Sequence, residues 1–334
     1  MPKTAANTDA VPPQAPTSQV SAAARPALWS DYVQLLKPRV MSLVVFTALT
    51  GLVCAPTRIH PFLAAVAVFC IAVGAGAAGA LNMAVEGDSD ALMRRTRGRP
   101  VAAGRVSRGD ALAYGVLLSC LAVTLMGLAV NWLAAGLLAF TVVFYAWFYT
   151  IILKRSTPQN IVIGGAAGAL PPVIGWAAAT GTAPPEAWLL FLIIFLWTPP
   201  HFWALSLYTS EDYAKAGIPM MPVVKGAKST RLQILIYSLV LVPVAIAPIF
   251  VGLGGVWYGA VSIVGGLAFI GLAFRLWRSR AGEAPDADSV GREEVLYDVK
   301  TEAKSARNLF AFSILYLFAL FAALLAEHGL KGAF

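Results

Sequence analysis

Residues 61–90 read PFLAAVAVFCIAVGAGAAGALNMAVEGDSD, an apolar run that passes into a polar stretch with three acids. The first part, 61–84, is long enough to cross a bilayer as one helix, which takes about 20 residues. Asn82, Glu86 and Asp90 then follow at intervals of four residues. On a helix these side chains form one stripe about 12 Å long, here called the polar stripe. Ionised side chains at membrane depth cost roughly 3 kcal/mol each, so acids kept there usually bind something.

The rest of the chain is equally apolar. Of its 334 residues, 58% are hydrophobic and 13% are charged, and the mean hydropathy is +0.72. Soluble domains carry about 25% charged residues, so this composition argues against a soluble protein. Recurring apolar runs predict an all-α, polytopic membrane bundle of about nine transmembrane helices. The predicted spans are 36–55, 61–84, 109–130, 132–152, 160–180, 187–208, 232–252, 256–277 and 308–327.

Positive charge is distributed unevenly between the two ends of these spans. Of the 25 Lys and Arg residues, all but Arg58 and Lys331 fall on the side that holds the N-terminus. The positive-inside rule therefore predicts a cytoplasmic N-terminus. The same rule accounts for the net charge of +8, so no nucleic-acid partner is predicted.

The segments outside the spans indicate the domain organisation. Residues 1–30 are rich in Ala, Pro, Ser and Thr and predict a disordered tail. Residues 31–330 then form a single transmembrane domain, in which the loop 281–307 is also predicted to be disordered. The three cysteines lie in apolar segments without a CxxC pair, which argues against a disulfide framework or a zinc site.

The acids predict a site for a divalent metal. Oxygen ligands on one helix face suit Mg²⁺, which takes carboxylates together with phosphate oxygens and water. Asp88 points away from the polar stripe if the helix continues. A second acidic pair, Glu211 and Asp212, ends the sixth span on the same side of the membrane. Two oxygen-rich groups that face one pocket indicate a metal and a phosphorylated substrate.

Basic residues follow the polar stripe at once, in the run 94–100. Topogenic charge explains some of these arginines, but guanidinium groups also suit the oxygens of a diphosphate. Arg95 and Arg99 are the candidates in this run, and Lys154 at the end of the fourth span is the third.

His201 is a lone histidine in an apolar segment. It could ligate haem iron, donate a proton or only hydrogen-bond within the bundle, and the last of these is slightly favoured. Four aromatic residues lie near the same membrane level and either form an interfacial belt or stabilise a carbocation. They are Phe148, Tyr149, Phe202 and Trp203.

Paired prolines interrupt two of the predicted spans. Pro171-Pro172 in the fifth span and Pro199-Pro200 in the sixth each predict a broken helix. In the fifth span Gly164, Gly165 and Gly168 precede the prolines, and their main predicted role is close helix packing.

Several motifs resemble a known family. The polar stripe followed by Arg95-Thr96-x2-Arg99-Pro100 resembles the first aspartate-rich motif of the UbiA-type intramembrane prenyltransferases. Four further stretches are similar to the haem O synthases, or protohaem IX farnesyltransferases, within that family. They are Leu153-Lys154-Arg155-x-Thr157-x2-Asn160-Ile161-Val162-Ile163-Gly164-Gly165, Pro171-Pro172-x2-Gly175-Trp176, Trp197-Thr198-Pro199-Pro200-His201-Phe202-Trp203-Ala204-Leu205 and Asp212-Tyr213-x2-Ala216-Gly217-Ile218-Pro219-Met220.

The resemblance covers about residues 33–325, with two departures. The middle acid of the first motif is usually Asp, and here it is Glu86. The second motif lacks the DxxxD spacing of the superfamily because position 216 is Ala. The choice between Glu211 and Asp212 as the metal ligand therefore stays open.

The resemblance implies transfer of a farnesyl group from farnesyl diphosphate to the vinyl group of haem B (protohaem IX), which gives haem O for haem-copper oxidases. It implies Mg²⁺, a lateral opening toward the lipid bilayer, and a bacterial plasma (inner) membrane location with the site on the cytoplasmic side. An oxidase-assembly protein such as a haem A synthase is a candidate partner. The implied metal and diphosphate ligands are Asn82, Glu86, Asp90, Glu211 and Asp212, the diphosphate-binding cations are Arg95, Arg99 and Lys154, and the haem contact is His201.

Two other functions remain open from the residues alone. The acceptor could be an aromatic quinone precursor, although the Trp197–Trp203 run argues for haem. The chain could instead be a membrane transporter with an acidic ion site. A transporter more often holds its acids near the middle of the bilayer, whereas these acids are predicted at one face.

Overall fold

The computed structural model describes residues 27–283 and 293–331, and within them it contains helices and no strand. The elements are α1 (Trp29–Leu35), α2 (Pro38–Cys54), α3 (Pro61–Leu92), α4 (Arg108–Ala129), α5 (Trp132–Val143), the π-helix η1 (Phe144–Leu153), α6 (Lys154–Ser156), α7 (Asn160–Ala169), α8 (Pro171–Thr180), α9 (Pro185–Tyr208), α10 (Ser210–Lys215), α11 (Met221–Ile246), the 3-10 helix η2 (Ala247–Ile249), α12 (Val256–Arg278) and α13 (Glu293–Lys331).

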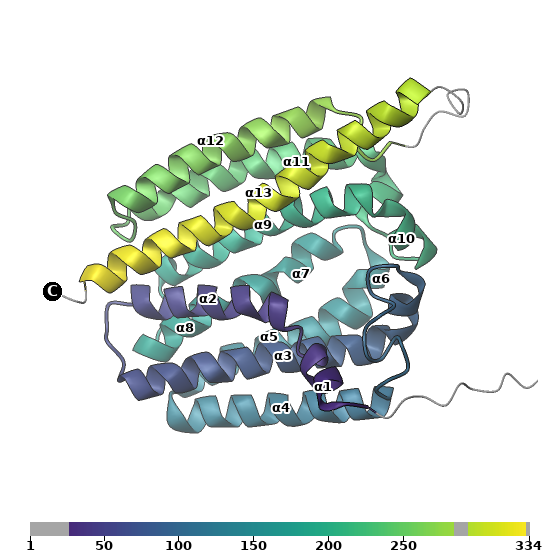
Figure 1. The fold of residues 1–334 in the computed structure, drawn as a ribbon. Coiled ribbons are helices and arrows are strands. Elements are labelled where there is room, and N and C mark those ends of the chain that lie inside the picture. Colours follow the sequence, from purple (N-terminus) through teal and green to yellow (C-terminus); the bar gives the residue numbers. More distant parts are fainter. Residues whose placement is uncertain (1–26, 284–292, 332–334) are drawn as a thin grey trace, which may run out of the picture.

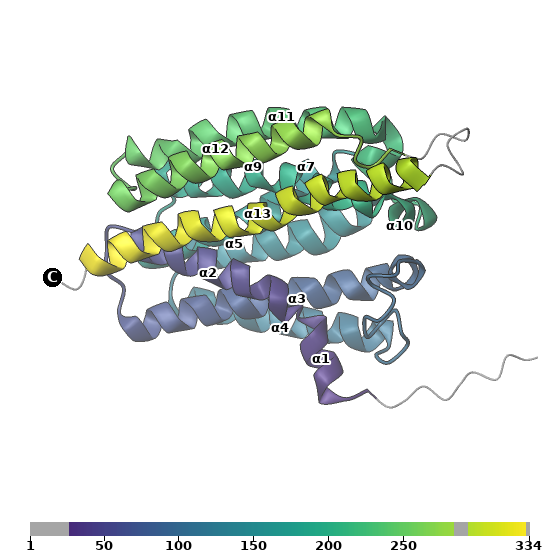
Figure 2. The same cartoon turned by 45° about the horizontal axis from the view of Figure 1, so that its top comes forward.

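The predicted membrane bundle is confirmed over the described residues. Eight helical segments are long and apolar enough to cross a membrane. The pair α1 and α2, which is bent by 50°, supplies a ninth. Figures 1 and 2 show the long helices side by side, with α10 and the loop between α3 and α4 at the same end of the bundle. The cytoplasmic orientation of the N-terminus stays a prediction.

Two predicted disordered segments differ in part from the structure. Most of the predicted tail falls in residues 1–26, outside the described residues, and α1 already begins at Trp29. In the loop predicted over 281–307, residues 284–292 are outside the described ranges. From Glu293 onward the chain is helical, because α13 extends well before its apolar part. The prediction failed there because it followed hydropathy, which does not detect a polar helical turn that continues a span.

One of the two predicted helix breaks is present. α7 ends at Ala169 and α8 begins at Pro171, so the break at the first proline pair is confirmed. The break at Pro199-Pro200 is wrong, since α9 continues through both prolines. Prolines remove backbone hydrogen-bond donors, but in a membrane bundle neighbouring helices can satisfy the freed backbone groups, so the helix continues. α9 packs against α7, α11 and α13, which supply that support.

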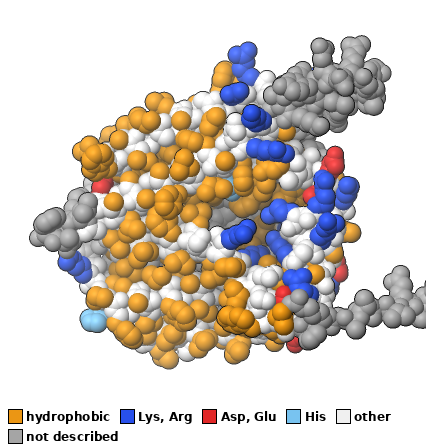
Figure 3. All heavy atoms as spheres, viewed as in Figure 1, with side chains coloured by type: hydrophobic (Ala, Val, Ile, Leu, Met, Phe, Trp, Pro, Cys, Tyr) orange, Lys and Arg blue, Asp and Glu red, His pale blue; other side chains and the backbone are white. Residues whose placement is uncertain are grey.

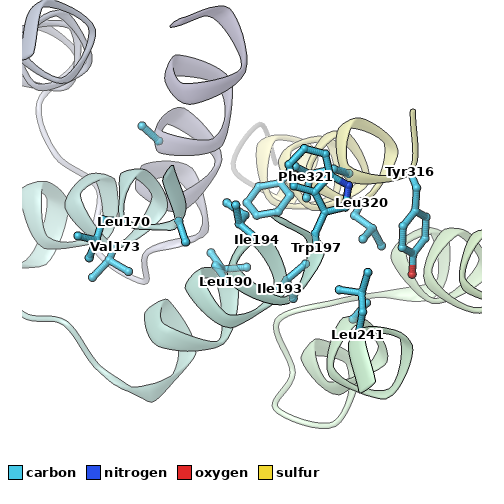
Figure 4. Close-up of a cluster of buried hydrophobic side chains, with 14 of the residues drawn as sticks. Leu170, Val173, Leu190, Ile193, Ile194, Trp197, Leu241, Tyr316, Leu320 and Phe321 are labelled. Atoms are coloured by element: carbon cyan, nitrogen blue, oxygen red, sulfur yellow. The ribbon is translucent and has the colours of Figure 1, made fainter. Parts of the chain in front are cut away.

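The hydrophobic core centres on α9. Figure 4 shows Leu190, Ile193, Ile194 and Trp197 of α9 between the α7–α8 break and α13. All four side chains are at most 6% exposed. The Trp197 indole donates a hydrogen bond of 2.7 Å to the Ser313 carbonyl oxygen on α13. This packing holds α9 and α13 together beneath the polar end of the bundle.

Glycine allows α2 and α8 to approach backbone to backbone. A Cβ atom on Gly175 would collide with the carbonyl oxygen of Ala48, and one on Gly51 with that of Pro172. The packing role predicted for the glycines of α7 holds for Gly164, against Tyr149, and for Gly165, against Thr198. It does not hold for Gly168, where an added Cβ would meet nothing within 4 Å.

The α2–α8 contact yields a stability test. Gly175→Ala forces α2 and α8 apart and should lower the free energy of unfolding by at least about 1–3 kcal/mol, the usual cost of overpacking. Gly168→Ala is the matched control and should be neutral or stabilising by up to about 1 kcal/mol, because alanine favours helix. Thermal unfolding midpoints in detergent measure both. Equal midpoints for the two variants would contradict the close contact.

Candidate functional site

The polar stripe is buried at the end of α3. Asn82, Glu86 and Asp90 are 2%, 3% and 1% exposed. α3 remains helical through Leu92, so the three side chains share one face as predicted. The Asp88 side chain is 81% exposed and pairs with Arg108 outside the stripe. The prediction that Asp88 points away is therefore confirmed.

Both carboxylates of the stripe are paired with predicted diphosphate-binding cations. The Lys154 ammonium lies 2.5 Å from Glu86 Oε1. Arg99 Nη1 contacts both carboxylate oxygens of Asp90, at 2.9 and 2.7 Å. Sequence reasoning placed these four residues at one site, and the structure brings them together. It adds that each acid already holds a cation.

The second acidic pair reaches the same end of the bundle on α10. Asp212 is 8% exposed, and its Oδ1 lies 3.2 Å from Arg94 Nε in the loop after α3. Arg94 was not among the predicted site residues, but its ion pair with Asp212 joins the loop after α3 to α10. Glu211 is exposed. Among the described residues no three His, Cys, Asp or Glu side chains are close enough to hold a metal ion.

Arg95 is exposed. The metal and diphosphate roles of the eight residues predicted for them stay predictions, as does the haem contact of His201.

The loop 93–107 is folded against the polar stripe. Thr96 Oγ1 donates to the backbone oxygen of Asp90 at 2.9 Å. Arg105 donates to Asp31 Oδ1 of α1 at 2.8 Å and to the Gly98 carbonyl oxygen at 3.0 Å. These bonds tie the basic run to α1 and to the end of α3. The position of Arg99 beside Asp90 therefore depends on an ordered loop.

Lys37 is a site residue that sequence reasoning missed. It lies at the elbow between α1 and α2, and its φ of 52° makes it the one described non-glycine residue with a positive φ. Its ammonium donates to Asn82 Oδ1 at 2.6 Å and lies 5.9 Å from the centroid of the Tyr145 ring. Gly79 on α3 lets the end of α1 approach closely, because an added Cβ would lie 3.2 Å from the Leu35 carbonyl oxygen.

The sequence held only a weak signal for Lys37. A Lys-Pro pair at the start of the first span looks like a topogenic charge before a helix start. A left-handed residue before proline is sterically unfavourable, and such strain persists only where the surrounding structure imposes it. Nothing in the residue types predicts the backbone turn that directs this side chain inward.

The π-helix η1 completes the surroundings of Asn82. Asn82 Nδ2 donates to Thr150 Oγ1 at 3.1 Å, and Thr150 Oγ1 donates to the Tyr145 carbonyl oxygen at 2.7 Å. π-helical turns are rare and are frequently found at functional sites. In η1 Tyr145 and Tyr149 stack at 5.3 Å beside α3. The Asn82 amide is thus fixed with its oxygen toward Lys37.

Of the four predicted aromatic neighbours, Tyr149 lies on η1 and stacks on Tyr145. Trp203 is fully buried and packs edge-on against Tyr237.

His201 lies deeper, on α9. Its ring is stacked between Trp197 at 4.2 Å and Phe310 at 4.6 Å. Its Nδ1 is 2.7 Å from Ser313 Oγ. Ser313 Oγ donates its hydrogen to the Phe310 carbonyl oxygen at 2.6 Å, so it accepts from Nδ1–H. Nε2 then carries the free lone pair, and it makes no hydrogen bond to a described residue.

The surface of the bundle has a depression on one side. Figure 3 shows a depression near the middle of the face that carries α2, α7 and α13, with Lys and Arg side chains at its edge and apolar side chains around it. The lateral opening toward the bilayer stays a prediction.

The site and the fold agree with comparisons to known proteins. The model of the UbiA prenyltransferase family matches residues 44–289. The chain belongs to this family. A curated relative from Caulobacter sp. (strain K31), "Protoheme IX farnesyltransferase", is 67% identical over 322 residues, which cover 93% of each chain. One of the same name from Caulobacter vibrioides is 64% identical over 318 residues, 94% of this chain and 95% of the relative. The resemblance stated from the motifs is therefore confirmed.

Solved structures share the family fold at low sequence identity. A digeranylgeranylglyceryl phosphate synthase superposes with a TM-score of 0.69 at 16% identity, covering 89% of this chain and 98% of that one. A UbiA homologue from Archaeoglobus fulgidus, bound to GPP and Mg²⁺, has a TM-score of 0.60 at 16% identity, covering 86% and 99%.

The buried ion pair of Glu86 yields a second stability test. Lys154→Met leaves the Glu86 carboxylate unpaired, which should lower the free energy of unfolding by about 3–5 kcal/mol. Adding Glu86→Gln to Lys154→Met should restore most of it, because no unpaired charge is then left. Arg108→Gln, which breaks the exposed pair between Arg108 of α4 and Asp88 of α3, should change little. Thermal unfolding midpoints of wild type and the three variants measure these differences in stability. A double variant as unstable as Lys154→Met would contradict the ion pair between Lys154 and Glu86.

Proposed function

We propose that this protein transfers the farnesyl group of farnesyl diphosphate to the vinyl group of haem B, giving haem O. The observation that carries the proposal is the buried polar stripe, whose two carboxylates hold Lys154 and Arg99. Relatives 64% and 67% identical over nearly the whole chain are named protoheme IX farnesyltransferases and support this choice of acceptor.

The donor set fits a magnesium diphosphate. Asn82, Glu86, Asp90 and Asp212 supply only oxygen ligands, as Mg²⁺ prefers, and all four are at most 8% exposed. Mg²⁺ bound there would neutralise charge on the leaving diphosphate. The A. fulgidus homologue bound to GPP and Mg²⁺ supports a diphosphate substrate together with Mg²⁺ here. Glu211, which is exposed, is the weaker of the two acids on α10.

An exchange of ion-pair partners would let the same side chains bind both a diphosphate and a metal ion. Lys154, Arg99 and Arg94 form ion pairs with Glu86, Asp90 and Asp212, respectively. When a diphosphate enters, these cations turn to its oxygens and leave the carboxylates free for the metal. Arg95 and Lys37 add positive charge, and guanidinium groups suit phosphate oxygens in particular. The site stays close to electrically balanced in both states.

The reaction itself requires a carbocation pocket and an acceptor. The bond between farnesyl C1 and the diphosphate oxygen breaks, and the haem vinyl π-electrons form the new carbon–carbon bond. Water adds to the resulting cation as hydroxyl, and its second proton is released. The stacked Tyr145 and Tyr149 rings beside Glu86 present π-faces that favour a cation. His201, whose Nε2 makes no hydrogen bond to a described residue, is the proposed contact for haem iron.

The alternatives have less support. A transporter would more often hold its acids near mid-membrane, whereas these acids lie at one end of the bundle (Figure 1). A quinone-precursor acceptor leaves the lone-pair nitrogen of His201 without a role. A location in the inner membrane, a cytoplasmic site and an assembly partner such as a haem A synthase belong to the proposal.

The acids provide the test of activity. Asp90→Asn should reduce Mg²⁺-dependent diphosphate release from farnesyl diphosphate and haem B by about 10²-fold or more, since metal-ion stabilisation contributes several kcal/mol. Asp88→Asn, two residues away and exposed, should remain active. Mass spectrometry of extracted haem should show the hydroxyfarnesyl addition for wild type and Asp88→Asn. Its absence from wild type, or equal product from both variants, would sink the proposal.

Lys37 provides a test of substrate affinity. Lys37→Met removes one cation and should raise the KM for farnesyl diphosphate by about tenfold, roughly the effect of one charge-assisted hydrogen bond. The KM for haem B should stay unchanged. Arg39→Met, two residues along and exposed, is the control and should behave as wild type. Steady-state kinetics in detergent measure both constants, and an unchanged KM for farnesyl diphosphate would exclude Lys37 from the donor site.

A further inference from the structure

Aromatic side chains on the C-terminal part of α9 and on the part of α13 packed against it form a wall. This aromatic wall leads from His201 toward the polar end of the bundle. His201 stacks on Phe310, and Phe310 meets Tyr208 edge-on at 6.3 Å. The Arg307 guanidinium then lies 5.5 Å from the centroid of the Tyr208 ring. These side chains form a continuous path from a lone-pair nitrogen, past apolar ring surface, to a positive charge.

Arg307 differs from the arginines on the other side of the site. Arg94, Arg99 and Arg105 are each paired with a carboxylate. Arg307 is exposed, and it makes no ion pair or hydrogen bond to any described residue. A guanidinium held over an aromatic ring keeps its N–H donors free for a ligand.

The spacing along the helices matches a haem. Ser313, which bonds His201, lies six residues after Arg307 on α13, about 9 Å at the helical rise of 1.5 Å per residue. On α9 the step from His201 to Tyr208 is seven residues, about 10 Å. This is comparable to the distance between the iron of haem B and the carboxylates of its two propionate arms. The ring of the macrocycle would then lie along the aromatic wall.

We propose that Arg307 anchors a propionate carboxylate of the haem acceptor while His201 faces the iron, so that Arg307 determines which porphyrins are accepted. This rests on the proposed function, because it concerns the acceptor of that reaction. A carboxylate takes planar, two-donor hydrogen bonds from a guanidinium, and such charge-assisted bonds are the strong ones. The anchor would orient the vinyl edge of the macrocycle relative to the donor site.

The test uses two acceptors, haem B and its dimethyl ester, in which both carboxylates are masked. Arg307→Gln should lower kcat/KM for haem B by about tenfold, because a charge-assisted bond is lost. It should leave kcat/KM for the ester and the KM for farnesyl diphosphate unchanged, and Arg307→Lys should recover part of the loss. Arg278→Gln, an exposed arginine at the end of α12, is the matched control and should change neither acceptor.

A second variant separates this role from a general loss of activity. Arg95→Gln acts at the diphosphate and should slow both acceptors equally. If Arg307→Gln also slows both equally, or slows neither, Arg307 is not a carboxylate anchor. Binding is titrated in parallel through the Soret absorbance of each acceptor. If the wild-type protein turns over neither acceptor, the proposed function is wrong. The binding titration still tests the anchor, which requires that Arg307→Gln weaken the binding of haem B and leave the binding of the ester unchanged.

Discussion

Pairing of buried charges governs the architecture of this end of the bundle. Each of its buried acids, Asp31, Glu86, Asp90 and Asp212, contacts an arginine or lysine. An unpaired buried charge would cost several kcal/mol, so the acids can be kept only with their partners in place. The loop 93–107, the elbow before α2 and the π-helix each deliver a polar partner. They are therefore as much a part of the site as the acids.

The apolar part of the bundle makes this arrangement possible. Glycines bring α2 against α8, and α9 stays helical through two prolines while three helices pack around it. The result is a polar end on a closely packed apolar base. One side of this bundle carries a depression with Lys and Arg side chains at its edge (Figure 3).

The sequence predicted the residue types of the site better than their arrangement. The apolar runs located nine spans, and the spacing of Asn82, Glu86 and Asp90 placed them on one face, because helix periodicity is a local property. The role of Lys37 depends on one left-handed backbone angle, and the pairing of Arg94 with Asp212 depends on a contact between distant segments. Neither leaves a local pattern. The continuity of α9 was missed for the same reason, since its neighbours decide it.

We infer that Lys154 and Arg99 leave Glu86 and Asp90 for the diphosphate when the substrate enters, while the two carboxylates bind Mg²⁺. Diphosphate alone would take Lys154 and Arg99 from their acids, and metal alone would leave the cations unpaired, so each should bind weakly without the other. Calorimetry with an unreactive farnesyl thiodiphosphate, with and without Mg²⁺, measures this coupling directly. Mg²⁺ should tighten binding of the thiodiphosphate by about tenfold or more, a coupling of about 1.4 kcal/mol. Equal affinity with and without Mg²⁺ would contradict it.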